Sequence, residues 1–224
     1  MGWSYYCGPD FDQSVFESRM LQADDQMYRT KLSSGQSNRH VLVQGMMELL
    51  KVRDMMTEDH SQRLQQQAAM LGKAVGLSDS AIGDLRLLAQ FHDIGKVGVA
   101  DTILLKPDKL TRAERKEMER HSEIGHRIAQ SIAELAPISD LILKHHEWWN
   151  GQGYPLGLKG EEIPLESRIL ALVDSYDAMT SDRPYRKAMT NREAIAELRR
   201  FAGVQFDPDL VEVFVTSVMD KNKL

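Results

Sequence analysis

The chain has 224 residues, 42% of them hydrophobic and 27% charged, which are ordinary proportions for a globular protein. Its formal net charge of −5 gives no overall attraction to DNA or RNA, and no apolar run approaches the roughly 18 residues of a membrane span. Cys7 is the single cysteine, so an internal disulfide is excluded and, with no signal-peptide pattern, a reducing cytoplasm is expected.

The first predicted helix covers residues 12–32 and ends near Gly35, in a stretch rich in serine. We take this stretch as a domain boundary. It divides the chain into an N-terminal helical segment, 1–38, and a main domain, 39–224. The leading helix could pack on the main domain or pair two chains as a homodimer.

Two further helices are predicted over residues 40–56 and 57–75. In the second, apolar residues recur at spacings of three and four, and His60 shares their face. Gly76 ends this helix, and Ser78 opens the next one. That helix leads to the neighbouring pair His92 and Asp93, which therefore lies at its C-terminal end.

Residues 97–109 are predicted to form an irregular apolar connection. Thr111 and Glu114 then make a capping box for a helix that runs through His121 to about residue 136. Pro137 can open the helix that leads to the adjacent pair His145 and His146.

Residues 150–160 hold four glycines and one proline, which predicts a loop with special backbone angles. Pro164 opens a strongly apolar helix. Thr190 with Glu193 makes a second capping box, and Pro208 starts the last helix. Because no strand pattern is found from residue 39 onward, the predicted fold class is all-α.

Five histidines and two aspartates are spaced along this helical stretch by about one helix and one connection each. They are His60, His92, Asp93, His121, His145, His146 and Asp174. Taken singly, each is more often a core or surface residue than a ligand, and Asp174 could be a buried salt-bridge partner. Together, imidazoles and carboxylates suit iron, manganese, nickel or zinc. An aspartate shared among several histidines fits two metal ions, the usual arrangement for hydrolysing phosphate esters.

The segments FHDIGKVGVADTILLKPDKLT, KHHEWWNGQGYPLGLKGEEIP and SRILALVDSYDAMTSDRPYR resemble those of the HD-GYP phosphodiesterases, a branch of the HD superfamily. The resemblance covers about residues 39–224. It implies an all-helical bundle with a metal centre in its core. It also implies hydrolysis of cyclic di-GMP to pGpG, and often on to GMP, by attack of a metal-bridging hydroxide.

The resemblance also assigns roles to individual residues. One metal would be held by His60, His92, Asp93 and Asp174, and a second by Asp93, His121, His145 and His146. Asp93 would bridge the two, and Lys96 would lie near the scissile phosphate. Gly153, Tyr154, Arg183 and Arg186 would line the dinucleotide pocket. Alternatively, Tyr154 only anchors its loop, and the two arginines are solvated charges.

Met56 stands where trinuclear members carry a glutamate, one helical turn before His60. A thioether is a poor substitute for a carboxylate, so two ions are expected rather than three, with iron or manganese favoured over nickel or zinc. Asn150 and Ser122 depart from common family residues at positions that are not ligands.

The N-terminal stretch ADDQMYRTK resembles the last helix of a GGDEF domain, which implies a GGDEF domain partner in a longer protein. Two other functions stay open on the sequence. One is a catalytically weak domain that binds cyclic di-GMP or a partner protein. The other is an HD phosphohydrolase that acts on another nucleotide, such as cyclic GMP-AMP.

Overall fold

The structure is a computed structural model that describes residues 45, 48, 58–182 and 187–221, of which residues 58, 59 and 218–221 are described by their backbone alone. The helices belong to a compact unit, Met47–Leu224. The described residues form no strand, only two isolated bridges, so the predicted all-α class is confirmed. The predicted helix 12–32 and the boundary at residue 38 lie outside the described residues. Of the predicted helix 40–56, only residues 45 and 48 are described, and both are helical.

The first two helices pack against each other through apolar faces. Helix α2 spans Glu58–Ala74 and α3 spans Asp79–Phe91. Leu64, Ala68 and Leu71 of α2 are fully buried, as their spacing predicts. The Ser78 side chain caps α3 by accepting the N–H of Ala81, which confirms the predicted helix start.

The connection from α3 is more regular than predicted. It contains a 3₁₀ turn, η1 (Ile94–Gly98), and a short helix, α4 (Asp101–Leu104), so the prediction of an irregular stretch over 97–109 is wrong in part. The four residues of α4 form a single helical turn, which is too short to leave a periodic pattern in the sequence.

The capping box of Thr111 and Glu114 is confirmed, but the single helix predicted to follow it is wrong. The chain forms α5 (Arg112–Glu119) and α6 (His121–Gln130), with a break at Arg120, whose ψ is −13°. Helix α5 buries no residue, whereas α6 buries His121 and three others. The break therefore redirects the chain from a solvated helix into one that packs on the core.

Short elements connect α6 to the central helix. They are η2 (Ala136–Ile138), α7 (Ser139–Lys144) and, after the glycine-containing loop, η3 (Gly160–Glu162). The proline of η2 lies at its first turn, as expected at a helix start. The loop over 150–160 is confirmed and contains a cis peptide bond between Tyr154 and Pro155.

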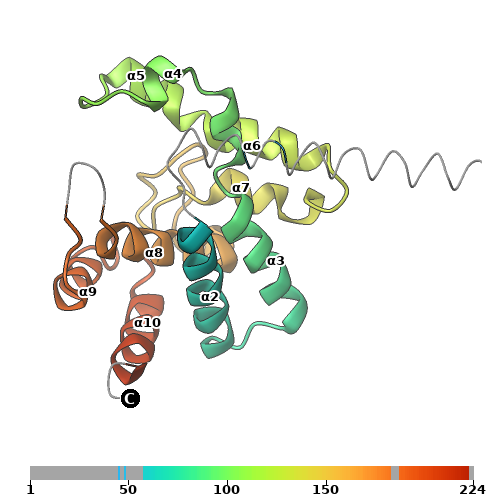
Figure 1. Cartoon of the computed structure of the whole chain (residues 1–224). Coiled ribbons are helices and arrows are strands. Elements are labelled where there is room, and N and C mark those ends of the chain that lie inside the picture. Colours follow the sequence, from blue (N-terminus) through green and yellow to red (C-terminus); the bar gives the residue numbers. More distant parts are fainter. Residues whose placement is uncertain (1–44, 46–47, 49–57, 183–186, 222–224) are drawn as a thin grey trace, which may run out of the picture. The chain divides into compact units, whose positions relative to one another are not determined.

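Helix α8 (Leu165–Thr180) is central to the unit, because it contacts α2, α3, α7, α9 and α10 (Figure 1). Four apolar residues of its middle turns, Ile169, Leu170, Leu172 and Val173, are fully buried. The chain continues in α9 (Asn191–Arg200), whose capping box is confirmed, and ends in α10 (Pro208–Lys221).

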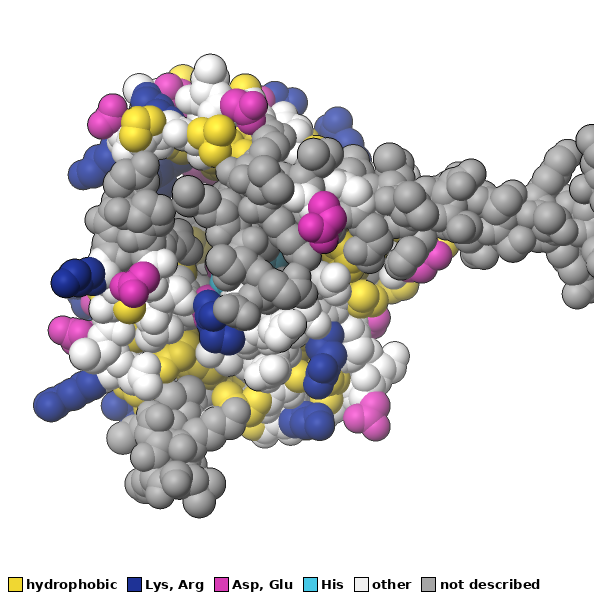
Figure 2. Space-filling view, viewed as in Figure 1, with side chains coloured by type: hydrophobic (Ala, Val, Ile, Leu, Met, Phe, Trp, Pro, Cys, Tyr) yellow, Lys and Arg dark blue, Asp and Glu magenta, His cyan; other side chains and the backbone are white. Residues whose placement is uncertain are grey.

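On the face that Figure 2 shows, basic and acidic side chains are interspersed and form no continuous basic area. Within the described residues, no helix combines the length and the hydrophobicity needed to cross a bilayer.

Candidate metal centre

Three histidines are oriented in the same way at the ends of helices. His92 follows α3, His121 begins α6 and His145 follows α7. In each, Nδ1 lies within hydrogen-bonding distance of the carbonyl oxygen three residues earlier, at 3.0, 2.8 and 2.6 Å respectively. A carbonyl oxygen can only accept a hydrogen bond, so Nδ1 carries the proton and Nε2 carries a lone pair in the neutral ring.

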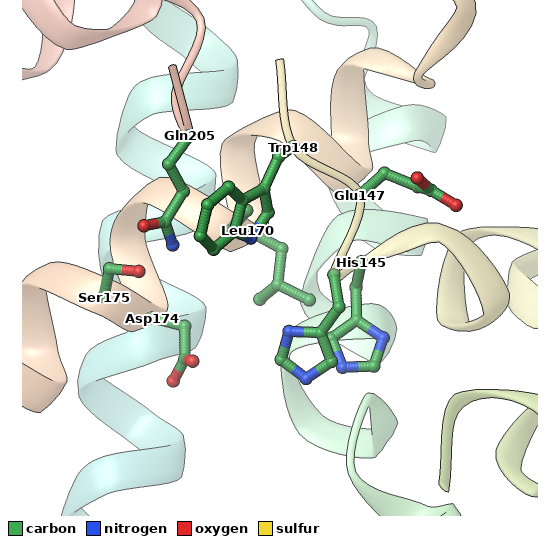
Figure 3. Close-up of a pocket in the computed structure, with 9 residues that line it drawn as sticks. His145, Glu147, Trp148, Leu170, Asp174, Ser175 and Gln205 are labelled. Atoms are coloured by element: carbon green, nitrogen blue, oxygen red, sulfur yellow. The ribbon is translucent and has the colours of Figure 1, made fainter. Parts of the chain in front are cut away.

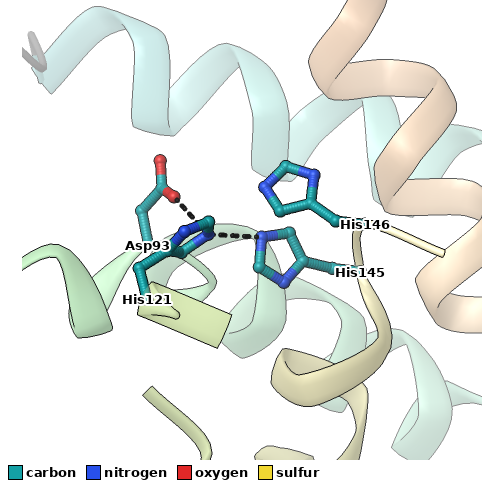
Figure 4. Close-up of side chains that lie close together, drawn as sticks. All are labelled: Asp93, His121, His145 and His146. Carbon is teal, nitrogen blue, oxygen red and sulfur yellow. Dashed lines mark hydrogen bonds and ion pairs between the residues drawn. The ribbon is translucent and has the colours of Figure 1, made fainter. Parts of the chain in front are cut away.

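These lone pairs meet in the interior. Ligand atoms of Asp93, His121, His145 and His146 all lie within 4.8 Å of one another (Figure 4). The Nε2 atoms of His121 and His145 are 3.4 Å apart. Two acceptor nitrogens that face each other cannot form a hydrogen bond, whereas a cation between them satisfies both. The donor set therefore fits a divalent metal that accepts nitrogen and oxygen ligands.

Asp93 connects this cluster to His92. Its Oδ2 lies 3.3 Å from Nε2 of His92 and 2.9 Å from Nζ of Lys96. Its Oδ1 lies 3.5 Å from Nε2 of His121. The carboxylate thus presents one oxygen to each side, which is the geometry that a ligand shared by two ions requires.

Burial and neighbouring charge set the protonation of the centre. Burial lowers the pKa of His121, lowers that of His146 to about 3, and holds that of His145 well below its usual range. Burial also acts against a charge on His92 and on Asp93. There it is outweighed by their mutual attraction, which raises the pKa of His92 to about 9. Asp93 is ionised because the charge of Lys96, and after it that of His92, outweighs burial and holds the pKa of Asp93 well below its usual range.

A close backbone contact places Asp93 beside His121. Gly95, in η1, lies directly against α6, where an added Cβ would meet the carbonyl oxygen of His121 and, at 2.5 Å, the amide nitrogen of Gly125. Because backbone atoms cannot move aside, only glycine fits there. The glycine of the HDIGK segment is thus explained by packing between η1 and α6.

The ligands expected for the other ion are less closely gathered. Asp174, on α8, lines a pocket together with His145 and His146, but its carboxylate lies apart from the His145 ring (Figure 3). Its charge contributes to the raised pKa of His92. His60 is bonded through Nδ1 to Asp177, at 2.6 Å. The structure therefore brings together the four residues expected at one metal, and only His92 and Asp93 of those expected at the other.

The glycine-containing loop holds His146 in place. An added Cβ at Gly153 would lie 2.5 Å from the His146 carbonyl oxygen, and it would also meet backbone atoms of residues 147 and 148. The N–H of Tyr154 donates to the same carbonyl at 3.2 Å. The buried carboxylate of Glu147 accepts the N–H groups of Leu156 and Leu158, at 2.6 and 3.0 Å. The loop is thereby fastened to the segment that carries His146.

A second set of contacts fastens the same segment to the loop before α10. The N–H of Trp149 donates to the carbonyl of Gln205, at 3.1 Å. The guanidinium of Arg168 lies 5.6 Å from the centre of the Trp149 ring and pairs with Asp207 at 2.7 Å. Gln205 also lines the pocket that contains His145 and His146. The wall of the centre therefore includes residues more than 50 positions apart in the chain.

Two expected site residues, Arg183 and Arg186, lie outside the described residues, and so does Met56, the position at which the third metal ligand is missing. Sequence reasoning gave no role to Glu147, Asp177 or Arg63. Asp177 could have been noticed because it follows Asp174 by three positions in an apolar helix, so both carboxylates share one face.

Comparison with known proteins gives a consistent result. A family model described as "HD domain" matches residues 44–210. A cyclic di-GMP phosphodiesterase of Thermotoga maritima is 39% identical over 169 residues, which cover 75% of this chain and 46% of the relative. A cyclic di-GMP phosphodiesterase response regulator of Xanthomonas campestris is 39% identical over 168 residues, covering 74% of this chain and 44% of the relative.

A 3′3′-cGAMP-specific phosphodiesterase of Vibrio cholerae is 34% identical over 176 residues, covering 78% of this chain and 34% of that protein. The crystal structure of a cyclic GMP-AMP specific phosphodiesterase from the same organism shares the fold, with a TM-score of 0.55 at 23% identity, over 81% of this chain and 49% of that chain. This chain spans less than half the length of each of these relatives.

Proposed function

This chain belongs to the HD domain family, and on that premise we propose that it is a metal-dependent phosphodiesterase that hydrolyses cyclic di-GMP to pGpG. The HDIGK and GYP segments give it the features of the HD-GYP branch. The substrate is supported by relatives that are 39% identical and are named cyclic di-GMP phosphodiesterases.

One observation carries the proposal. His121 and His145 direct their Nε2 lone pairs at each other over 3.4 Å, beside the ionised Asp93. A purely structural core would not keep two acceptor nitrogens in this arrangement, because neither can satisfy the other. A bound cation removes the conflict.

We propose that two ions are held, each by four side chains. One would be bound by Asp93, His121, His145 and His146, and the other by His60, His92, Asp93 and Asp174. Such ions activate water and stabilise the negative charge that builds up on a phosphate under attack. Imidazole and carboxylate ligands favour iron or manganese, with nickel or zinc as further candidates.

The surrounding residues would bind and orient the dinucleotide. The Lys96 ammonium, 2.9 Å from Asp93, is close enough to the centre to hold a phosphate oxygen. Tyr154 lies beside His146, and Gly153 brings the loop close to it. Arg183 and Arg186 would contribute guanidinium groups, which suit phosphate and guanine edges.

The wider assignments are proposals too. We propose that residues 1–38 are the end of a GGDEF domain and that residues 39–224 are the main domain. We also propose a GGDEF domain partner in a longer protein and a cytoplasmic location. The single cysteine fits a reducing compartment.

A second substrate, cyclic GMP-AMP, is favoured by one specific observation. The 3′3′-cGAMP-specific relative is 34% identical over 78% of this chain, so both substrate classes occur among its relatives. A substrate panel with cyclic di-GMP, 3′3′-cGAMP and linear pGpG distinguishes them by the ratio of kcat/KM.

The proposal is tested by hydrolysis of cyclic di-GMP by protein loaded anaerobically with Fe²⁺ or Mn²⁺, with products separated by chromatography. Asp93→Asn should abolish turnover and lower the metal content while the helix content stays unchanged. The control, Asp79→Asn, changes an exposed aspartate at the start of α3 and should leave both unaffected. A metal-loaded wild type that binds cyclic di-GMP but releases no pGpG would contradict the proposal and favour a binding domain.

A further inference from the structure

Asp177, on α8, is a buried carboxylate to which the site described above gives no function. Its side chain is 2% exposed and contacts three partners. Oδ2 lies 2.6 Å from Nδ1 of His60, and Arg63 donates from Nε to Oδ1 at 2.7 Å and from its terminal nitrogen to Oδ2 at 3.1 Å. Ser181 donates to Oδ2 at 3.3 Å.

These contacts fix which nitrogen of His60 carries the proton. The two-point pairing with Arg63 keeps Asp177 ionised, and an ionised carboxylate can only accept hydrogen bonds. His60 must therefore donate from Nδ1. A cation bound by this neutral ring would meet Nε2.

The same contacts fix where the ring lies. His60 is in the first turn of α2, and Asp177 is one turn after Asp174 on α8. The two helices pack side by side (Figure 1). Arg63 also donates to Ser181, at 3.0 Å, so it joins α2 to the end of α8. These contacts therefore fix the position of the His60 ring along α8 relative to Asp174.

A simple helix-to-helix ion pair needs only Arg63 and Asp177. His60 is not needed for such a pair, yet it makes the shortest contact with the Asp177 carboxylate, at 2.6 Å. It does so through Nδ1, and a histidine that binds a metal with one ring nitrogen commonly directs the other at an outer carboxylate. The arrangement matches the carboxylate–histidine–metal relay in which an outer acid orients a ligand and raises its basicity.

We infer that Asp177, supported by Arg63, is a positioning residue of the metal centre that holds His60 in the tautomer and orientation needed to bind the ion shared with Asp174. This inference rests on the proposed function, in which His60 is a metal ligand. It goes beyond that proposal because it assigns two residues that bind neither metal nor substrate.

The test is equilibrium binding of Mn²⁺ to the metal-free full chain, with free Mn²⁺ measured by electron paramagnetic resonance. The variants are His60→Ala, Asp177→Asn and the double variant. The matched control is Glu212→Gln, because Glu212, on α10, also accepts a two-point pairing from an arginine of a neighbouring helix, Arg199 on α9, with both contacts at 2.9 Å. This pair has no part in the metal centre, so the control removes a helix-to-helix charge pair alone.

Asp177→Asn should weaken one class of Mn²⁺ site by roughly ten- to a hundredfold, as is typical when an outer partner is lost. The other class should stay within about twofold of wild type. The double variant should bind no more weakly than His60→Ala, since the carboxylate acts only through that ring. If the double variant is clearly weaker, Asp177 is itself a ligand and the inference is overturned.

Three other outcomes also overturn it. The first is unchanged Mn²⁺ binding in folded Asp177→Asn, and the second is an equal loss in Glu212→Gln. The third is unchanged Mn²⁺ binding in His60→Ala, which removes the premise that His60 is a ligand. These readouts need no turnover, so a chain that binds Mn²⁺ as expected but hydrolyses nothing contradicts the proposed function and leaves the inference standing.

If Asp177→Asn does not fold, Arg63→Gln replaces it, because the Arg63 side chain is 43% exposed and can be changed with less disturbance. Proton–nitrogen correlation spectra of the histidine rings then report the tautomer, with the His60 signals assigned by their absence in His60→Ala. The wild type should show a slowly exchanging Nδ1 proton that is lost or broadened in Arg63→Gln. A His60 ring protonated on Nε2 in the wild type would refute the inference.

Discussion

Tyr154 lies with its ring against that of His146, with 4.8 Å between the ring centroids and 34° between the planes. The tyrosine of the GYP segment is therefore in contact with a candidate metal ligand.

This contact predicts different results for two Tyr154 variants. Tyr154→Ala should weaken Mn²⁺ binding roughly fivefold, because a ring pair is worth about 1 kcal/mol. Tyr154→Phe keeps the ring and should hold Mn²⁺ affinity within about twofold, while KM for cyclic di-GMP rises because the hydroxyl is missing. If Tyr154→Phe loses as much metal as Tyr154→Ala, ring packing is not what holds His146.

The tight turn at Gly153 predicts a large cost for one methyl group. In Gly153→Ala the new Cβ meets backbone atoms of three consecutive residues, so unfolding in urea should show a loss of about 2–3 kcal/mol. Gly83→Ala is the matched control, because nothing lies within 4 Å of its Cβ position in α3. That variant should gain about 0.5–1 kcal/mol from better helix propensity. Equal stability of the two variants would contradict the described backbone contact.

The raised pKa of His92 predicts proton release when metal binds. At pH 7.5 the metal-free ring is protonated because its pKa is about 9, and a ligand ring must be neutral. Isothermal titration with MnCl₂ in two buffers of different ionisation enthalpy should show about one proton released per chain from this residue. The release should decline as the pH is raised through about 9. Metal binding at pH 7.5 without proton release would show that His92 is already neutral.

The lowered pKa of Asp177 predicts when its charge matters for stability. Burial opposes its ionisation, but the hydrogen bonds from His60 and Arg63 outweigh this and lower its pKa to about 2. A depressed folded-state pKa contributes stability above the ordinary value near 4, and that stability is lost as the pH falls toward 2. The difference in unfolding free energy between wild type and Asp177→Asn should thus be about 2 kcal/mol at pH 6 and shrink below pH 4. A difference independent of pH would mean that the carboxylate charge is not involved.

Local rules predicted much of the fold. Ser78, Thr111 and Thr190 were expected to cap helices, and each accepts the backbone N–H of the residue three positions on. Each of these caps involves residues only three positions apart, so it can be predicted without knowledge of how the helices pack. The break at Arg120 was missed because it depends on how α6 packs against η1, and no residue in the sequence around it indicates a stop.

The site was predicted in part for a similar reason. The spacing of the candidate ligands indicated convergence because each gap is about one helix and one connection. The structure adds that His121 begins a helix and that His145 follows one. The partnership of His60 with Asp177 and Arg63 was missed, because it depends on how α2 and α8 align over a separation of 117 residues. Residue type alone does not reveal which of two nearby carboxylates faces a given ring.

The opposed nitrogens of His121 and His145 have a consequence for the life of the protein in a cell. A fold that keeps two lone pairs in conflict until a cation arrives is less stable without it, by an amount that grows with the logarithm of the free ion concentration. Molecules made during metal starvation would therefore open more often and be degraded sooner than those made in metal-replete cells. The amount of this protein would then follow the supply of its ion with no change in its synthesis.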